Sequence, residues 1–156
     1  MNKVFEVKDS ENKSLIIFYY RGNDSEKIFR IKRYIYNLTN FILNIIAMNY
    51  ENKQADDISG YSEFLDEELE FIFHQETINV ISGSYDFPQF VRAKIYLLRE
   101  TIRPMISNTL NKKMKRNDPD WVKVSEMARE ILKDLGKEQM TPSEFEKKEN
   151  LSMDWL

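Results

Sequence analysis

The sequence predicts an α+β fold in which three main helices pack with a small antiparallel sheet of one or two hairpins. Two runs near the N-terminus, rich in β-branched and aromatic residues and separated by polar residues, predict strands. Apolar residues then recur at spacings of three and four in three long segments, which predicts amphipathic helices. The chain has 156 residues, 42% hydrophobic and 31% charged, enough for one core, and we expect residues 1–156 to form a single domain.

Residues 1–50 are expected to form a hairpin followed by a long helix. The strands are predicted at Lys3 to Val7 and at Ser14 to Tyr20, with the polar segment 9–13 as the turn. Residues 21–25 supply a second turn and a helix cap. The helix from about Glu26 to Tyr50 has the clearest apolar stripe in the chain: Ile28, Ile31, Ile35, Leu38, Ile42 and Ile45.

Residues 51–87 have an ambiguous pattern. Phe64, Leu65 and Leu69 suit a short helix, whereas Leu69, Phe71 and Phe73 alternate as in a strand. We expect both elements in that order. Residues 76–81 would then form the partner strand of a second hairpin, with its turn near residues 74–76.

Residues 88–150 are expected to be helical. Asp86 is expected to cap a helix, with Pro88 in its first turn and Gln89 at the reciprocal position of a capping box, and Pro104 is expected to kink or break that helix. Asp118 and Pro119 open a third helix, and Gly136 lies where a C-terminal cap glycine belongs. A capping box at 141–144 begins a short polar helix before the tail 151–156, which either folds back onto the core or docks on a partner.

The composition excludes several functional classes. The chain contains no cysteine, so it forms no disulfide and has no thiolate nucleophile. His74 is its single histidine, and we expect it to be structural or solvated rather than catalytic. Because no glycine-rich phosphate loop or metal-ligand motif occurs, we expect no catalytic residue, no metal and no cofactor. The apolar run 41–48 is too short to span a bilayer, which favours a cytoplasmic protein without membrane contact.

Charge is distributed unevenly along the chain. Residues 51–87 carry ten acidic and one basic side chain, net −9, and residues 88–116 carry eight basic and one acidic, net +7. Such a run is often only a solvated face that keeps the protein soluble. The two segments could also pair with each other inside the fold, although exposed ion pairs contribute little stability.

The function we favour from the sequence is a non-enzymatic inhibitor or regulator that binds another protein. Because carboxylates and phosphates are attracted by the same cations, an acidic surface suits the basic channel of a nucleic-acid-binding enzyme such as a nuclease. Small acidic chains without motifs are common among phage and mobile-element anti-defence proteins, including anti-restriction and anti-CRISPR proteins. The expected partner-binding residues are Asp56, Asp57, Tyr61, Glu63, Phe64, Asp66, Glu67, Glu68 and Glu70.

The alternative is a nucleic-acid-binding regulator that uses the basic segment 92–116. The two helices predicted within residues 121–146 are spaced as in a helix-turn-helix motif, although the second helix carries no arginine. The residues expected to contact phosphates are Arg103, Lys112, Lys113, Lys115 and Arg116.

Overall fold

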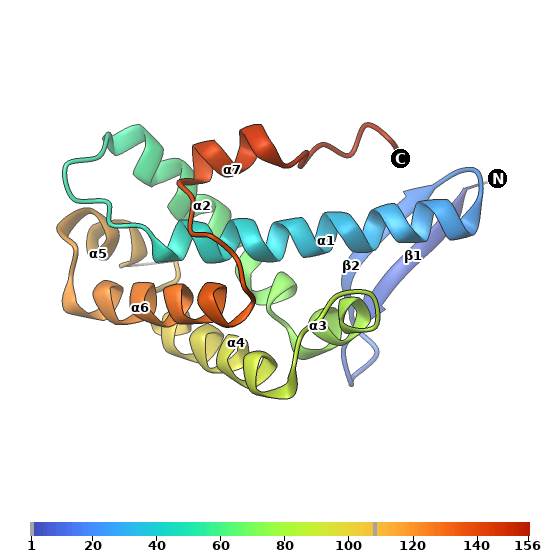
Figure 1. Cartoon of the computed structure of the whole chain (residues 1–156), viewed down its shortest axis with the longest axis horizontal. Helices are drawn as coiled ribbons and strands as arrows, with labels where there is room; N and C mark the ends of the chain where they lie inside the picture. The colour runs from blue at the N-terminus through green and yellow to red at the C-terminus, as the bar shows by residue number, and fades with distance from the viewer. Residues whose placement is uncertain (1, 108) are drawn as a thin grey trace.

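The helix α1 (Asp24–Ala47) runs along the length of the molecule, and the other elements pack around it (Figure 1). The structure is a computed structural model that describes residues 2–107 and 109–156. Within these residues, seven α-helices pack with one two-stranded sheet, which confirms the α+β class. The elements after α1 are α2 (Ala55–Ile72), α3 (Gln75–Ser82), α4 (Gln89–Ile102), the 3₁₀ turn η1 (Arg103–Met105), α5 (Leu110–Arg116), α6 (Pro119–Asp134) and α7 (Pro142–Lys148).

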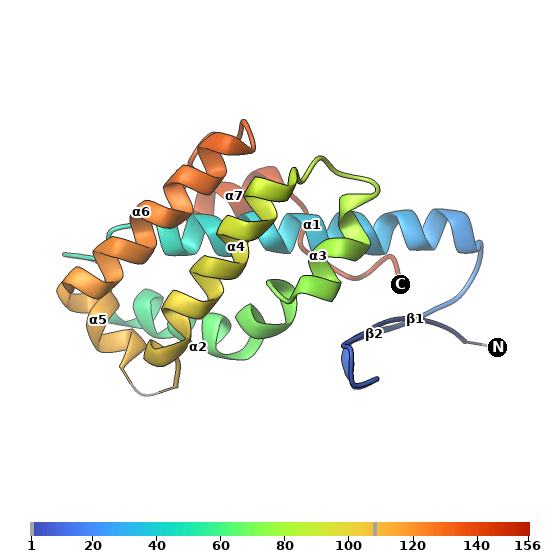
Figure 2. The ribbon, with the colours of Figure 1, turned by 90° about the horizontal axis from the view of Figure 1, so that it is seen from below.

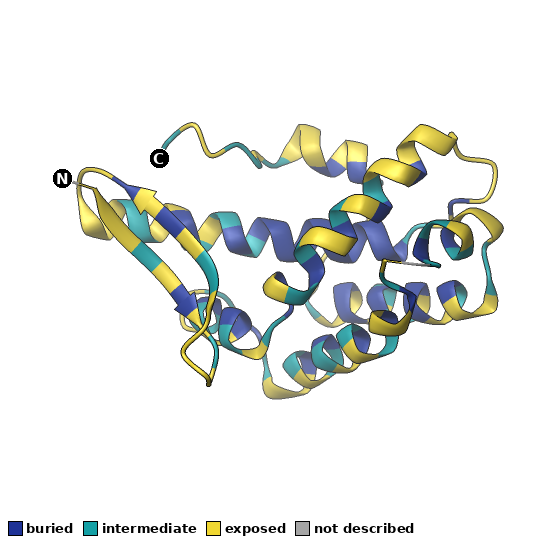
Figure 3. Cartoon of the chain, turned by 180° about the vertical axis from the view of Figure 1, so that it is seen from behind, coloured by how far each residue is buried: buried dark blue, intermediate teal, exposed yellow. Residues whose placement is uncertain are grey.

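The second half of α1 is surrounded by protein on all sides. Every residue from 37 to 47 is buried, which Figure 3 shows as a continuous dark stretch of helix. Since the last carbonyls of a helix lack partners within it, they need donors from elsewhere. Trp121 Nε1 donates to the Met48 carbonyl at 3.2 Å, Ser125 Oγ to Ile46 at 2.7 Å and Arg129 to Ala47 at 2.9 Å. Three side chains of α6 therefore satisfy the buried end of α1.

The N-terminal hairpin forms as predicted. β1 (Lys3–Lys8) pairs with β2 (Ser14–Tyr20) in antiparallel register, with Phe5 opposite Phe18. One face packs on α1, where the Phe18 ring meets the Tyr34 ring edge-on with their centroids 5.9 Å apart. The hairpin lies at the N-terminal end of α1, on the side away from α6 (Figure 2).

The predicted second hairpin is wrong, because both of its strands are helices. The helix α2 continues through residues 69–72, and residues 75–82 form α3. Leu65, Leu69 and Ile72 are buried at spacings of four and three, whereas Phe71 is exposed, as helical geometry requires. Leu69 and Phe73 are both buried because they lie four residues apart, one helical turn, with Phe73 as the C-terminal cap residue of α2. The apolar residues at 69, 71 and 73 therefore did not require a strand.

Several predicted helix boundaries are confirmed in the C-terminal half. α4 ends at Ile102, before Pro104, and Asp118 caps α6 by accepting a hydrogen bond from Asp120 N at 2.9 Å. Gly136 adopts the left-handed conformation (φ 68°) that ends α6. Asp86 does not cap α4: Pro88 occupies the cap position, and no side chain there accepts a hydrogen bond.

The C-terminal tail folds back onto the molecule. Trp155 packs edge-on against Tyr34 with ring centroids 6.5 Å apart, and its carbonyl accepts a hydrogen bond from Lys27. Leu151, Trp155 and Leu156 are half-buried against the core. Among the described residues, none of the helices combines the length and apolar character needed to cross a membrane.

Candidate functional site: an acid-rimmed groove beside α2

All nine residues expected to bind a partner lie on α2, and its helical geometry distributes them over different faces. Asp56, Asp57, Tyr61 and Phe64 line one groove. Glu63 and Glu67 are exposed on the helix surface. The sequence prediction assigned all these residues to one surface, and the structure brings only four of them together in the groove.

The groove lies between α1, α2, α7 and the C-terminal segment, and has a volume of about 380 Å³. Its remaining lining residues are Tyr34, Leu38, Phe41, Gly60, Glu146 and Leu151. The apolar floor is held in place by aromatic packing. The Phe41 ring meets the Phe64 ring edge-on at a centroid distance of 5.4 Å, and the Phe145 ring lies tilted against Phe41 at 5.8 Å. The groove therefore combines an apolar floor with carboxylates at its rim.

Two separate elements supply the rim carboxylates. Asp56 and Asp57 lie in the first turn of α2, where the helix dipole favours acidic side chains whatever their function. Glu146 comes from α7 and lies beyond its first turn, so the helix dipole does not explain its presence. Burial raises the pKa of Tyr61, and the negative charges of Glu146 and Asp57 raise it further. Carboxylates from α2 and α7 therefore act on the same phenol.

A further carboxylate of α2, that of Glu68, lies beside the groove. Glu68 is half-buried, and its pKa is raised by burial and by the neighbouring charge of Glu67. Burial raises the pKa of Tyr34, and the charge of Glu68 acts in the same direction. Because Tyr34 lines the groove, Glu68 continues the acidic rim beyond it.

Two of the predicted partner-binding acids make intramolecular contacts. Glu70 accepts two hydrogen bonds from Arg103, at 2.5 and 3.0 Å, and this lowers the pKa of Glu70. Asp66 accepts a hydrogen bond from the Ser107 backbone N–H at 2.9 Å and so holds the chain between η1 and α5 against α2. These contacts lie outside the groove.

The basic segment 92–116 is partly neutralised within the fold. Arg103 is engaged by Glu70 and Glu100, and Lys113 binds Asp120 at 2.6 Å and Asp118 at 3.6 Å. Three exposed cations remain on α5 without an ion pair among the described residues: Lys112, Lys115 and Arg116. Two of the five residues predicted to contact phosphates are therefore engaged within the fold, and three are not.

The helices that suggested a helix-turn-helix motif both pack on α1. α6 covers the C-terminal end of α1, and α7 is held to α1 through Phe145, which is buried against Phe41. The remaining exposed face of α7 carries acidic and basic side chains side by side, among them Glu146 and Lys147.

His74 has a structural role at the junction of α2 and α3. Its Nδ1 atom accepts a hydrogen bond from Glu76 N at 3.1 Å, so it caps α3. Within residues 2–107 and 109–156, no three histidine, aspartate or glutamate side chains gather in an arrangement that could hold a metal ion.

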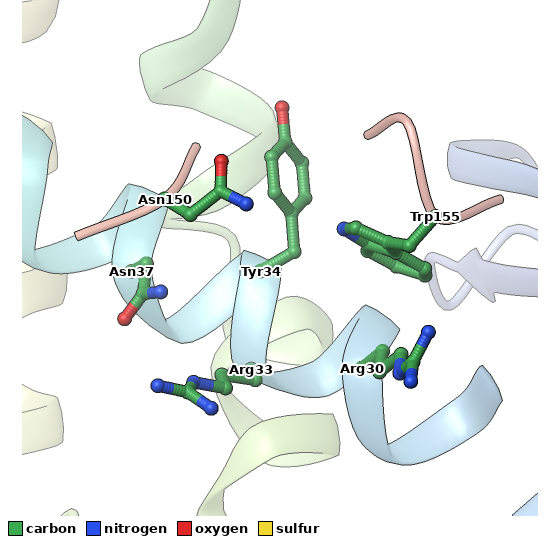
Figure 4. A pocket seen from close by; sticks show the side chains of 6 residues that line it. All are labelled: Arg30, Arg33, Tyr34, Asn37, Asn150 and Trp155. Atoms are coloured by element: carbon green, nitrogen blue, oxygen red, sulfur yellow. The ribbon is translucent and has the colours of Figure 1, made fainter. Parts of the chain in front are cut away.

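Sequence reasoning missed a polar stripe along α1, beneath the C-terminal segment. Its residues follow spacings of three and four: Arg30, Arg33, Asn37, Asn40 and Asn44. Figure 4 shows the cavity at one end, of about 340 Å³, where Tyr34 and Trp155 stand beside the stripe. Asn44 Oδ1 accepts a hydrogen bond from Met140 N at 2.7 Å, whereas Asn40 Oδ1 is buried without a partner. In the sequence, the three asparagines at spacings of three and four within an otherwise apolar helix could have indicated this stripe.

No protein-family model, curated protein or solved structure matches this chain. Its function is therefore inferred from the geometry and chemistry of its own residues.

Proposed function

We propose that this chain is a non-enzymatic inhibitor that binds another protein through the groove beside α2. The observation that carries the proposal is the convergence of Asp57 from α2 and Glu146 from α7 around the apolar floor formed by Tyr61 and Phe64. The helix dipole accounts for Asp57, in the first turn of α2, but not for Glu146, which lies beyond the first turn of α7. Their meeting at an apolar groove is typical of a binding surface.

The groove suits a partner segment that is both apolar and basic. Its floor offers aromatic rings to a large apolar side chain, and its rim offers carboxylates to lysine or arginine. Basic segments of this kind line the nucleic-acid channels of nucleases. By occupying such a channel, the acidic face of α2 would exclude the nucleic acid. A nuclease of a host defence system is therefore the partner we propose, which makes the chain an anti-defence protein.

The test compares two charge-reversal variants of equal net charge. The groove variant carries Asp57→Lys and Glu146→Lys, and the control carries Asp86→Lys and Glu126→Lys at exposed positions outside the groove. Each tagged protein is used to capture partners from a lysate of its native host after nuclease treatment. The captured partner is then purified, and its cleavage of nucleic acid is measured with increasing amounts of each variant.

The proposal predicts that the wild-type chain and the control bind and inhibit the partner, whereas the groove variant loses both activities. Binding should weaken at high salt, because attraction between exposed charges is screened within about 8 Å at physiological ionic strength. Equal inhibition by both variants would place the binding surface elsewhere. A parallel capture without nuclease treatment tests the alternative: recovery of nucleic acid alone, lost on substitution of Lys112, Lys115 and Arg116, would favour the nucleic-acid-binding regulator.

A further inference from the structure

A second polar pocket lies between α3 and α4, away from the groove. It has a volume of about 280 Å³ and is lined by Gln75, Asn79, Gln89, Arg92, Ala93 and Tyr96. It shares no lining residue with the groove. Three of the lining side chains are amides, and the charged one is Arg92. Its size suits a small ligand or part of a larger one.

The pocket faces a stripe of α4 whose buried polar atoms have no partners. Arg92, Tyr96 and Arg99 follow at spacings of four and three and so share one face of the helix. The buried atoms without a hydrogen-bond partner on this stripe are Arg92 Nε, Tyr96 Oη and Arg99 Nε. Each carries a hydrogen that it can donate. Since buried donors are almost always satisfied, three together on one stripe indicate a missing acceptor.

The charges around this stripe favour an anion. Lys94 on the same helix is neutralised by Glu130 and Asp134, and Arg103 in η1 by Glu70 and Glu100. Arg99 also pairs with Glu100, at 3.4 Å. Arg92 makes no ion pair within the described part of the chain, and its Nη1 reaches only the Asn79 amide oxygen, at 3.5 Å.

Both guanidinium groups lie close to the Tyr96 side chain. The Arg99 guanidinium carbon lies 5.8 Å from the centre of the Tyr96 ring, and Arg99 Nη1 donates to the Phe73 carbonyl at 3.1 Å. Burial raises the pKa of Tyr96, while the positive charges of Arg92 and Arg99 lower it and the negative charge of Glu76 raises it. Two cations and one carboxylate therefore surround this phenol.

We propose that the pocket between α3 and α4 binds a phosphate group, held by the Arg92 guanidinium and the Tyr96 hydroxyl. The donors available are more numerous than the two oxygens of a carboxylate can use, because the amides of Gln75, Asn79 and Gln89 add to those of Arg92 and Tyr96. A tetrahedral phosphate presents more acceptor oxygens, and arginine binds it through paired hydrogen bonds. Arg99 adds positive charge beside Tyr96, and Glu76 opposes binding.

The experiment is a titration of the whole chain with inorganic phosphate at constant ionic strength, followed by NMR and calorimetry. In the wild-type protein, the Arg92 and Arg99 Nε–H resonances should shift along a single saturable curve. The variant R92Q should weaken binding by about tenfold and Y96F by a smaller factor, since hydrogen bonds to charged groups are the stronger ones. The variant E76Q should strengthen binding, because it removes the competing carboxylate.

The variant K94Q is the matched control, because Lys94 lies on the same helix outside the pocket and is held by two carboxylates. It should leave phosphate affinity unchanged. Equal losses in K94Q and R92Q would show that phosphate acts only through general charge, and would overturn the site. Acetate binding as tightly as phosphate would overturn the assignment to phosphate. Nε–H resonances that do not respond at millimolar phosphate would also overturn it, whatever the variants do.

Discussion

A polar side chain inside the core stabilises or destabilises the fold, depending on whether its atoms have hydrogen-bond partners. Asn40 and Asn44 lie one turn apart on α1, and the side-chain amide of each donates to the carbonyl four residues earlier. The two differ at their oxygens. Asn44 Oδ1 accepts from Met140 N, whereas Asn40 Oδ1 is buried without a partner. An unsatisfied buried acceptor costs free energy, whereas a satisfied one ties two segments together.

We therefore expect Asn44→Leu to be more harmful than Asn40→Leu. Asn44→Leu leaves the Met140 N–H without its acceptor, and should lower the free energy of unfolding by about 1 to 3 kcal/mol. Asn40→Leu removes an unsatisfied oxygen along with one hydrogen bond, and should change stability much less. Urea unfolding of the two variants measures this difference, and equal losses would contradict the assignment of the partners.

The two half-exposed glutamates of α2, Glu68 and Glu70, should respond to pH in opposite directions. Arg103 lowers the pKa of Glu70 below its usual 4.5, so its contribution to stability is present above that pH and is lost as the pH falls through the lowered pKa. The pKa of Glu68 is raised by burial and by Glu67, so its ionisation destabilises the fold at neutral pH.

At neutral pH, Glu70→Gln should lower the free energy of unfolding by about 0.5 kcal/mol, because the Glu70 pair with Arg103 is partly exposed. Glu68→Gln should raise it. Both differences should vanish at a pH below both pKa values, where the side chains at positions 68 and 70 are uncharged in the wild type as well as in the variants. Denaturant unfolding as a function of pH gives the two curves. A loss of stability in Glu68→Gln at neutral pH would show that this carboxylate has a favourable contact.

At the scale of elements, α7 depends on its cap because it has only seven residues. Thr141 Oγ1 accepts a hydrogen bond from Glu144 N at 3.1 Å and lies 2.9 Å from the Glu144 carboxylate. Short helices are marginal alone and rely on caps and packing. Phe145 supplies the packing, against Phe41. Because α7 also carries Glu146, its order determines one wall of the groove.

Thr141→Ala should therefore lower the free energy of unfolding by about 1 kcal/mol, the usual effect of losing a cap. Ser143→Ala is the control, because Ser143 is exposed in the first turn and alanine favours helix. If α7 forms a wall of the binding site, Thr141→Ala should also weaken partner binding. Thermal unfolding and partner capture measure the two effects, and identical behaviour of both variants would exclude a capping role.

At the scale of the whole molecule, one core cluster joins all the helices around α1. Trp121 is fully buried, lies 5.9 Å from the Tyr50 ring and donates to the end of α1. Trp155 is half-buried in the tail and contacts Tyr34 in the N-terminal half of α1. The two tryptophans therefore report on the centre and the periphery of the same structure.

Trp121→Ala should lower the free energy of unfolding by about 3 to 5 kcal/mol, since it leaves a cavity in the core and removes the donor to the Met48 carbonyl. Trp155→Ala should cost much less and should mainly loosen the tail. Hydrogen exchange distinguishes the two, with protection lost along α1 in the first variant and only near residues 151–156 in the second. Global loss of protection in Trp155→Ala would show that the tail is part of the cooperative core.

The sequence by itself determined the α+β class, the hairpin, the long central helix and the helix boundaries marked by Asp118, Gly136 and Thr141, because these depend on local periodicity and capping. Only the tertiary structure decided that residues 69–72 and 75–82 are helical. A short apolar run fits helix and strand equally well until packing selects one.

The proposed binding surface depends on tertiary structure in the same way. The sequence predicted Asp56, Asp57, Tyr61 and Phe64 as binding residues, since they lie in one acidic segment, and the structure places them in one groove. The sequence placed Glu70 with them although Arg103 neutralises it, and it gave no reason to add Glu146, more than eighty residues away. Charge counted along the chain does not show which charges meet in space. Ion pairing and the convergence of α2 with α7 are properties of the folded chain alone.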